Sequence, residues 1–204
     1  MADLAADVVA VQELAPPQAE ALAAVLPFGR LDPARDFRGM GIARRSPGGV
    51  TRLPRAHRDA YLTEIEPPAG AAIEIVNVHI LAPHAGLPWR ALPIRRAQLR
   101  GLDAHIAASP ERCRVLVGDL NATPLWPMYR RLTRRLQDGA WDAVRGNGGR
   151  PGRTWGLWSG APRLLRIDHV LVCGVTVSAV RVVGVRGSDH SALVVDLTIP
   201  DGVG

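Results

Sequence analysis

Short apolar runs that end in polar side chains recur along the 204-residue chain, and the clearest lies at residues 115–124. Its first three residues are apolar and two of them are β-branched, which predicts a short buried strand. Gly118 then allows a close approach of the backbone to a neighbour. Asp119 and Asn121 lie two positions apart, so on an extended chain they point to the same side. A carboxylate and an amide so placed suit a metal-assisted phosphoryl site, and the alternative is an ordinary Asx-turn.

Similar patterns predict most of the remaining elements. Further strands are expected at residues 7–13, 39–43, 61–66, 71–80, 166–173, 175–185 and 192–197. The two strands at 61–66 and 71–80 flank a Pro-Pro-Ala-Gly turn and form a predicted hairpin. Helices are expected from Pro16 to about Leu26, at 94–108 and at 125–137. Residues 29–58 and 81–93 are predicted to be mainly loop, and the Gly-rich stretch 146–160 does not follow a strand as a dinucleotide-binding loop would.

Polar residues stand at one end of several of these predicted strands. They are Glu13, Asn77, His79, Asp168, His169, Asp189 and His190. Each has a plain structural alternative: Glu13 could be a solvated residue at a strand end, and His79 a histidine bonded to a backbone carbonyl. Asp168 and His169 interrupt an apolar run, where burial of either without a partner would be costly.

The formal net charge of +6 comes from an unusual source, because all 25 Lys/Arg positions are arginine. A basic chain favours a polyanionic partner such as nucleic acid or another phosphorylated substrate. The alternative is the codon bias of a GC-rich genome. Arg130 with Arg134, and Arg131 with Arg135, lie four apart on a predicted helix, where like charges repel. They form either a solvated face or a site for a partner, which would be phosphate or a neighbouring acid.

The two cysteines, Cys113 and Cys173, are isolated and show no metal-type spacing, which suits a reducing cytosol. No run is apolar enough to span a membrane, and no signal peptide is recognisable at Met1. A cytoplasmic location and one domain over residues 1–204 are therefore expected.

Five short motifs occur in an order that resembles the endonuclease/exonuclease/phosphatase superfamily of metal-dependent phosphoesterases. They are Gln12-Glu13, Asn77-Val-His79, Gly118-Asp-Leu-Asn121, Ile167-Asp-His169 and Ser188-Asp-His190. The resemblance implies an α/β fold, a four-layer sandwich of two mostly antiparallel sheets packed face to face with helices outside, as in DNase I.

The resemblance also implies roles for individual residues. Glu13 and Asp189 would lie at a Mg²⁺ ion, or Mn²⁺ in its place, since hard cations prefer oxygen ligands. Asp119 would orient or deprotonate the attacking water, Asn121 would bind phosphate, and Asn77 would help to hold the substrate site. Asp168 would hydrogen-bond His190 and favour its charged form. His190 and His79 would stabilise charge on the phosphoryl oxygens or transfer protons, and the base is either Asp119 or His190.

Two departures from the family pattern are visible. The family begins with an asparagine-bearing strand and a helix, whereas residues 1–6 alone precede the strand at 7–13 here, so the domain is expected to be N-terminally short. The tyrosine pattern of abasic-site endonucleases is also missing near Asn77. The leading hypothesis is a Mg²⁺-dependent phosphate-ester hydrolase, a phosphodiesterase, nuclease or phosphatase. The alternatives are a degenerate, non-catalytic phosphate- or nucleic-acid-binding domain and a purely structural domain. The sequence names neither the substrate nor the oligomeric state.

Overall fold

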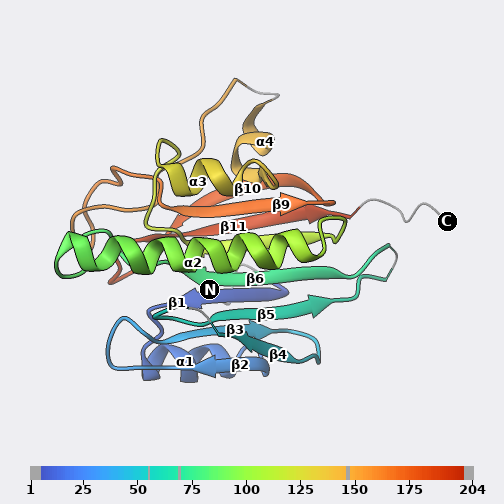
Figure 1. Cartoon of the computed structure of the whole chain (residues 1–204). Helices are drawn as coiled ribbons and strands as arrows, with labels where there is room; N and C mark the ends of the chain where they lie inside the picture. Colours follow the sequence, from blue (N-terminus) through green and yellow to red (C-terminus); the bar gives the residue numbers. More distant parts are fainter. Residues whose placement is uncertain (1–5, 55, 69, 146–147, 200–204) are drawn as a thin grey trace.

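A computed structural model describes residues 6–54, 56–68, 70–145 and 148–199. Its helices and strands form four layers, with helices outside two layers of strands (Figure 1). Helix α1 (Pro16–Ala23) covers one side, and α2 (Pro88–Ala108) and α3 (Pro127–Leu132) cover the other. The predicted four-layer α/β sandwich is confirmed.

The larger layer is a six-stranded sheet with the order β4-β5-β6-β7-β9-β8. Its strands are β4 (Val50–Leu53), β5 (Ala60–Ile65), β6 (Ile73–His79), β7 (Arg114–Asp119), β9 (Asp168–Cys173) and β8 (Gln137–Asp138). Among the described strands only β6 and β7 pair in parallel, and α2 connects them as a crossover helix. The predicted hairpin is confirmed by the antiparallel pairing of β5 with β6.

The second layer consists of two separate sheets, where one sheet was predicted. One has the order β1-β3-β2, from β1 (Val8–Gln12), β3 (Met40–Arg44) and β2 (Phe28–Asp32). The other pairs β10 (Thr176–Gly184) with β11 (Ser191–Thr198). Within the residues that the structure describes, no ladder joins β1 to β11, although Val8 and Val195 pack against the same core cluster. The unpaired edges of β1 and β11 therefore both lie over the same face of the six-stranded sheet.

Alternation along the strands builds two cores. The inner-facing residues of the six-stranded sheet pack against the second layer through Ile73, Ile75, Val115, Val170 and Val172. The opposite face of the same strands packs against α2 and α3 through Val76, Val78, Leu116 and Leu171. The inner face loses its apolar character at the end where β6 and β7 finish, which places polar side chains at the edge of the core.

Gly118 shows why this sheet is so closely joined. Its φ angle is 131°, and a Cβ built there would lie 2.0 Å from the carbonyl oxygen of Val78 on β6. The close approach expected at Gly118 is therefore confirmed, and Val78 is the neighbour. A larger residue could not keep this backbone conformation without moving β6 away from β7.

Three local predictions were wrong. Residues 29–58 hold most of β2 and all of β4 in addition to β3, which confirms the strand expected at 39–43. The segments of β2 and β4 were expected to be loop, but each forms a strand by pairing with a neighbour although its own pattern is weak. Helix α2 begins at Pro88, inside the segment predicted as loop, and Pro93 lies within it. The helix expected at 125–137 is limited to α3, and β8 and α4 (Gly139–Arg145) follow. On the arginine-rich segment, Arg131 and Arg135 both pair with Asp103 of α2, the neighbouring acid that was one of the two expectations.

Candidate active site

Three of the predicted site residues stand side by side on the six-stranded sheet. In the strand register His79 of β6 pairs with Asp119 of β7, and Asp119 pairs with Asp168 of β9. Paired residues of neighbouring strands project to the same face. The ends of these strands thus place one imidazole and two carboxylates in a row at the edge of the inner core.

The second layer supplies the other residues. Glu13 directly follows β1, where its φ angle of 54° turns the chain, and Asp189 and His190 directly precede β11. The side chain of Glu13 reaches His79, with Oε1 lying 3.8 Å from Nε2. The charge of Glu13 acts on Asp119, and the charges of Asp168 and Asp189 act on Glu13. The structure therefore brings residues 13, 79, 119, 168, 189 and 190 together from both layers.

His190 and Asp168 form the most clearly defined pair. The imidazole Nδ1 lies 2.9 Å from Oδ2 and 3.2 Å from Oδ1 of Asp168. Burial disfavours a charged imidazole, but the hydrogen bond to Asp168 and the charges of Asp168, Asp119 and Asp189 outweigh it and raise the pKa of His190 to about 9. His190 is therefore a cation at neutral pH, as the pairing with Asp168 was expected to make it.

Asp119 is buried and held in place by Asn121. Its Oδ1 accepts a hydrogen bond of 2.7 Å from the backbone N–H of Asn121, and its Oδ2 accepts one of 2.7 Å from the side-chain amide. Burial and the nearby carboxylate of Asp168 raise the pKa of Asp119 to about 8. The second amide hydrogen of Asn121 goes to the carbonyl of Ile80 at 3.0 Å. Asn121, at a φ of 47°, thus fixes the orientation of the carboxylate that could act on water.

The alternative expected for His79, a structural histidine bonded to a backbone carbonyl, does not describe its contacts. Its Nε2 lies 3.6 Å from Oδ2 of Asp119, and its buried Nδ1 has no hydrogen-bond partner. Burial, followed by the positive charges of Arg58, His190 and His57, lowers its pKa to about 3. The imidazole is therefore neutral and can donate or accept a single proton at Nε2.

Asn77 is placed differently from a substrate-binding residue. It is fully buried, and its amide nitrogen donates to the carbonyls of Val11 at 3.0 Å and Gly41 at 2.9 Å. Its amide oxygen accepts a hydrogen bond from Gln12. All of these contacts are internal, so Asn77 joins β6 to β1 and β3 and positions Glu13, and it presents no group to a ligand.

The donor set suits a divalent cation. Ligand atoms of Asp119, Asp168 and His190 all lie within 4.8 Å of one another. Partial burial, with the carboxylates of Asp189 and Asp168 adding to it, raises the pKa of Glu13. Carboxylates crowded in this way repel, and a dication relieves the repulsion while receiving the oxygen ligands that Mg²⁺ and Mn²⁺ prefer. The compact group of three does not include Glu13 or Asp189, the two ligands that the sequence predicted.

Several supporting residues gave no signal in the sequence. Trp155 donates from its indole Nε1 to Oδ2 of Asp189 at 3.0 Å, and Arg163 donates to the carbonyls of Ser188 and His190 at 3.1 and 3.0 Å. The hydroxyl oxygen of Thr154 accepts hydrogen bonds of 3.2 Å from the backbone N–H groups of Ile167 and Asp168. These contacts fix the loop that carries the Ser-Asp-His motif. Residues 154–163 lie far from residues 188–190 along the chain and meet them only in the folded structure, so nothing in the sequence indicates these contacts.

His169, the third residue of its motif, lies outside the site. Its Nε2 contacts the carbonyl of Ala122 at 2.8 Å, and its ring packs against Tyr129 with centroids 4.9 Å apart. Tyr129 in turn donates to Asp138, which forms a buried ion pair with Arg166 at 2.8 Å. His169 therefore holds the segment after Asn121 from behind the sheet.

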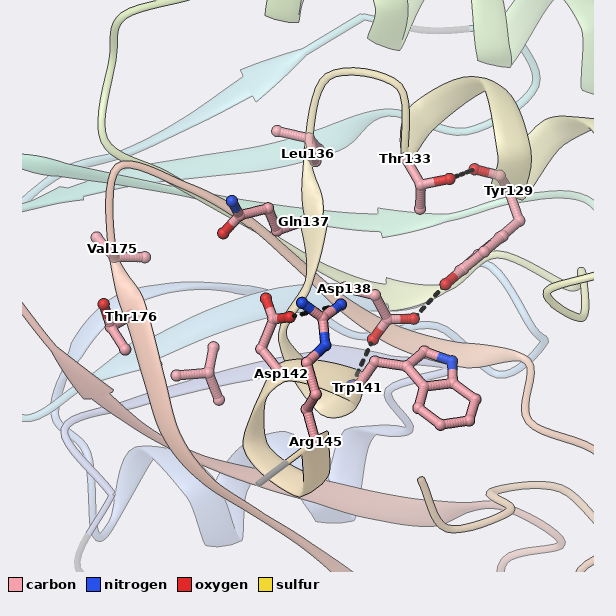
Figure 2. Close-up of a pocket in the computed structure, with 11 residues that line it drawn as sticks. Tyr129, Thr133, Leu136, Gln137, Asp138, Trp141, Asp142, Arg145, Val175 and Thr176 are labelled. Atoms are coloured by element: carbon pink, nitrogen blue, oxygen red, sulfur yellow. Dashed lines mark hydrogen bonds and ion pairs between the residues drawn. The ribbon is translucent and has the colours of Figure 1, made fainter. Parts of the chain in front are cut away.

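A separate pocket of about 570 Å³ lies between α3, β8, α4 and β10 (Figure 2). Asp138 points into it between Tyr129 and Trp141, and Asp142 pairs with Arg145 at its rim. The carboxylate of Asp138 is already bonded to Tyr129, Arg166 and backbone N–H groups. The pocket shares no residue with the site described above, and its charged groups are satisfied internally.

Two strand layers enclosed by helices, with acidic and imidazole side chains of both layers meeting at one end, define a DNase I-like protein. The chain belongs to the Endonuclease/Exonuclease/phosphatase family, whose profile matches residues 1–190. The family predicted from five motifs is thus confirmed, and membership indicates a hydrolase of the phosphoesterase kind that acts on phosphorylated or nucleic-acid substrates. Comparison with curated protein sequences gives no match.

Solved structures share the fold. A family protein from Bacteroides vulgatus is 20% identical with a TM-score of 0.70, over 97% of this chain and 86% of its own. One from Beutenbergia cavernae is 22% identical with a TM-score of 0.69, over 97% of this chain and 64% of its own. A humanized D. rerio TDP2 is 17% identical with a TM-score of 0.67, over 94% of this chain and 85% of its own. Among the helices in the described ranges, none combines the length and apolarity that a membrane crossing requires.

Proposed function

We propose that this protein is a Mg²⁺-dependent hydrolase of phosphate esters, with Mn²⁺ able to replace Mg²⁺. The observation that carries the proposal is the convergence of Glu13, Asp119, Asp168 and Asp189 around the charged His190. His190 balances the charge of one carboxylate there, and a divalent cation would balance the others. The family generally uses divalent metals, which agrees with this donor set.

Glu13 and Asp189 would hold the cation, and Asp119 or Asp168 would complete its ligands through water or directly. When bound, the cation supplies positive charge that polarises the phosphoryl group and lowers the pKa of nearby water. Side chains of the protein would do the remaining work. His190, held as a cation by Asp168, stabilises the negative charge that develops on the phosphoryl oxygens.

Hydrolysis forms one oxygen–phosphorus bond from water and breaks the bond to the leaving oxygen. The water loses a proton, which Asp119 would accept, because Asn121 fixes both of its oxygens and the charge of a bound cation would lower its raised pKa. His190 is placed to give a proton to the leaving oxygen, since Asp168 keeps it protonated. Exchanging these two roles also balances the reaction, because both groups can carry the proton.

The test is hydrolysis of bis(p-nitrophenyl) phosphate and p-nitrophenyl phosphate, with single-stranded DNA as a third substrate. We expect turnover with Mg²⁺, loss of turnover with EDTA and recovery when Mg²⁺ is restored. Asp119→Ala and His190→Ala should each lower kcat/KM by at least about 100-fold, the order of one acid–base or charge-stabilising group. Turnover that resists EDTA, or that is unchanged in both variants, would refute the proposal.

A second candidate function has one observation in its favour. Glu13 and Asp189 are attached to β1 and β11, and no ladder of the described residues joins these two strands. A site whose two halves are joined through the six-stranded sheet and not by a ladder of their own could bind a phosphate without turning it over. This non-catalytic phosphate- or nucleic-acid-binding domain predicts binding of single-stranded DNA that weakens with salt and occurs without cleavage.

A further inference from the structure

One arginine at the candidate site is buried without a counter-ion. Arg58 is 9% exposed and makes no ion pair within 4.0 Å of a carboxylate in the described part of the chain. Two of its nitrogens, Nε and Nη1, are buried and find no hydrogen-bond partner among the described residues. Guanidinium groups stay charged, and burying a charge without partners is costly. Within the described residues, no hydrogen bond to these two nitrogens offsets that cost.

The charges around Arg58 place it at the site. The carboxylates of Glu13 and Asp119 act on Arg58, and Arg58 acts on both Glu13 and His79. Burial outweighs the carboxylates and lowers the pKa of Arg58, although an arginine remains protonated. Arg58 is thus a fixed positive charge close to the residues that are to bind and hydrolyse the substrate.

The local backbone is built to hold this side chain. The guanidinium carbon lies 4.8 Å from the ring centre of Phe37, a cation–π contact that fixes the plane of the group. His57, directly before Arg58, has a φ angle of 71°, a left-handed conformation that costs energy in a non-glycine residue. Such strain persists where the surrounding structure requires a side chain in one place.

We propose that Arg58 binds the phosphoryl group of the substrate, donating hydrogen bonds to its oxygens as a catalytic residue additional to the family motifs. This inference rests on the proposed function, because it names a ligand for the same site. A guanidinium suits phosphate through its several N–H donors and permanent charge. Arg58 would thus give the phosphoryl oxygens a second cation in addition to His190.

A water molecule is the competing partner. A cavity of about 10 Å³ lies between Arg58, His79 and Gln98, which is room for about one water. If a bound water alone satisfied the buried nitrogens, Arg58 would be a structural residue, and its replacement would change stability without changing phosphate affinity.

The experiment compares Arg58 with a matched buried arginine. Arg44 is also buried, and its Nε also has no partner among the described residues. It lies at the end of β3 away from Glu13, and its Nη1 donates to the hydroxyl of Thr63. Arg58→Gln, Arg58→Lys, Arg44→Gln and Arg44→Lys are assayed for kcat/KM on bis(p-nitrophenyl) phosphate and for the inhibition constant of inorganic phosphate. Isothermal titration of inorganic phosphate gives an affinity that requires no turnover, and melting curves report stability.

We expect Arg58→Gln to lower kcat/KM by at least about 100-fold and to weaken phosphate binding at least about tenfold. Arg58→Lys should recover part of both, and guanidinium chloride at millimolar concentration should rescue Arg58→Ala. The Arg44 variants should change melting temperature alone. Phosphate affinity equal in the Arg58 and Arg44 variants would overturn the inference and support the structural water. If the wild type hydrolyses no ester, the proposed function fails, and the titration still decides whether Arg58 binds phosphate.

Discussion

Asn77 connects the two strand layers beside the candidate site, and its replacement tests that connection. The side chain is fully buried and uses its whole amide group, donating to the carbonyls of Val11 and Gly41 and accepting from Gln12. Asn77→Ala removes all three hydrogen bonds. Asn77→Asp keeps the shape of the side chain and the oxygen that accepts from Gln12. It replaces the amide nitrogen, which donates to two carbonyl oxygens, by a carboxylate oxygen that cannot donate to them.

The structure allows the magnitude to be worked out. Each buried hydrogen bond contributes about 1 kcal/mol, and the partners left without a bond add to the loss, so Asn77→Ala should lower the free energy of unfolding by about 3 kcal/mol. For a chain of this length that corresponds to a melting temperature about 6–12 °C lower. Asn77→Asp, although closer in shape, should be at least as destabilising, because a buried carboxylate would face two carbonyl oxygens.

The assay is urea unfolding followed by circular dichroism, with kcat and KM measured on the folded fraction. Thr51→Ala, an exposed change on β4, serves as the control and should alter stability by less than about 0.5 kcal/mol. We also expect kcat to fall, because Asn77 holds Gln12, the residue before Glu13. Normal stability in both variants, together with a raised KM, would show that Asn77 contacts the substrate and that the assigned positioning role is wrong.

Three further predictions concern the rest of the fold. Gly118→Ala should destabilise by at least about 3 kcal/mol in urea unfolding, because its Cβ would meet the backbone of β6, whereas Gly49→Ala, in open space, should be near neutral; equal effects would contradict the account of Gly118. Burial lowers the pKa of His169 to about 4, below its unfolded value near 6.5. His169 therefore contributes stability that is complete above pH 6.5 and is lost as pH falls through 4, about 2–3 kcal/mol between pH 7.5 and 4.5; His169→Gln should show a smaller loss, and an unchanged pH slope would be inconsistent with a neutral buried imidazole. In hydrogen exchange, amides of β1 and β11 should exchange faster than those of β6 and β7, because each has a single paired neighbour among the described strands; equal protection would mean that their open edges are covered.

The fold and most of the site were predictable because the site residues stand at strand ends. A carboxylate or imidazole that ends a β-branched run is conspicuous in the sequence. The five motifs also occur along the chain in the order that is typical of the family. Periodicity failed where strands depend on their neighbours: β2 is largely exposed and pairs only with β3, so its own pattern carries little information. Helix α3 ended early because β8 and α4 interrupt the apolar pattern that had suggested one long helix.

The roles of individual side chains were less predictable than their proximity. Asn77 looked like a ligand-binding amide, and only its three internal contacts show that it is a connector. Arg58 was one of many arginines in a segment expected to be loop, and nothing in its spacing distinguishes it. Its importance follows from burial, missing partners and nearby carboxylates, all of which depend on the packed structure.

Carboxylates from both strand layers should form one divalent cation site, and a titration with the cation itself decides whether they do. Mn²⁺ titration followed by electron paramagnetic resonance measures free and bound ion without requiring turnover. The account predicts one bound Mn²⁺ per chain, with affinity at least about tenfold weaker in Glu13→Gln and Asp189→Asn and unchanged in Glu20→Gln, an exposed change on α1. No bound Mn²⁺, or equal affinity in all three variants, would contradict it.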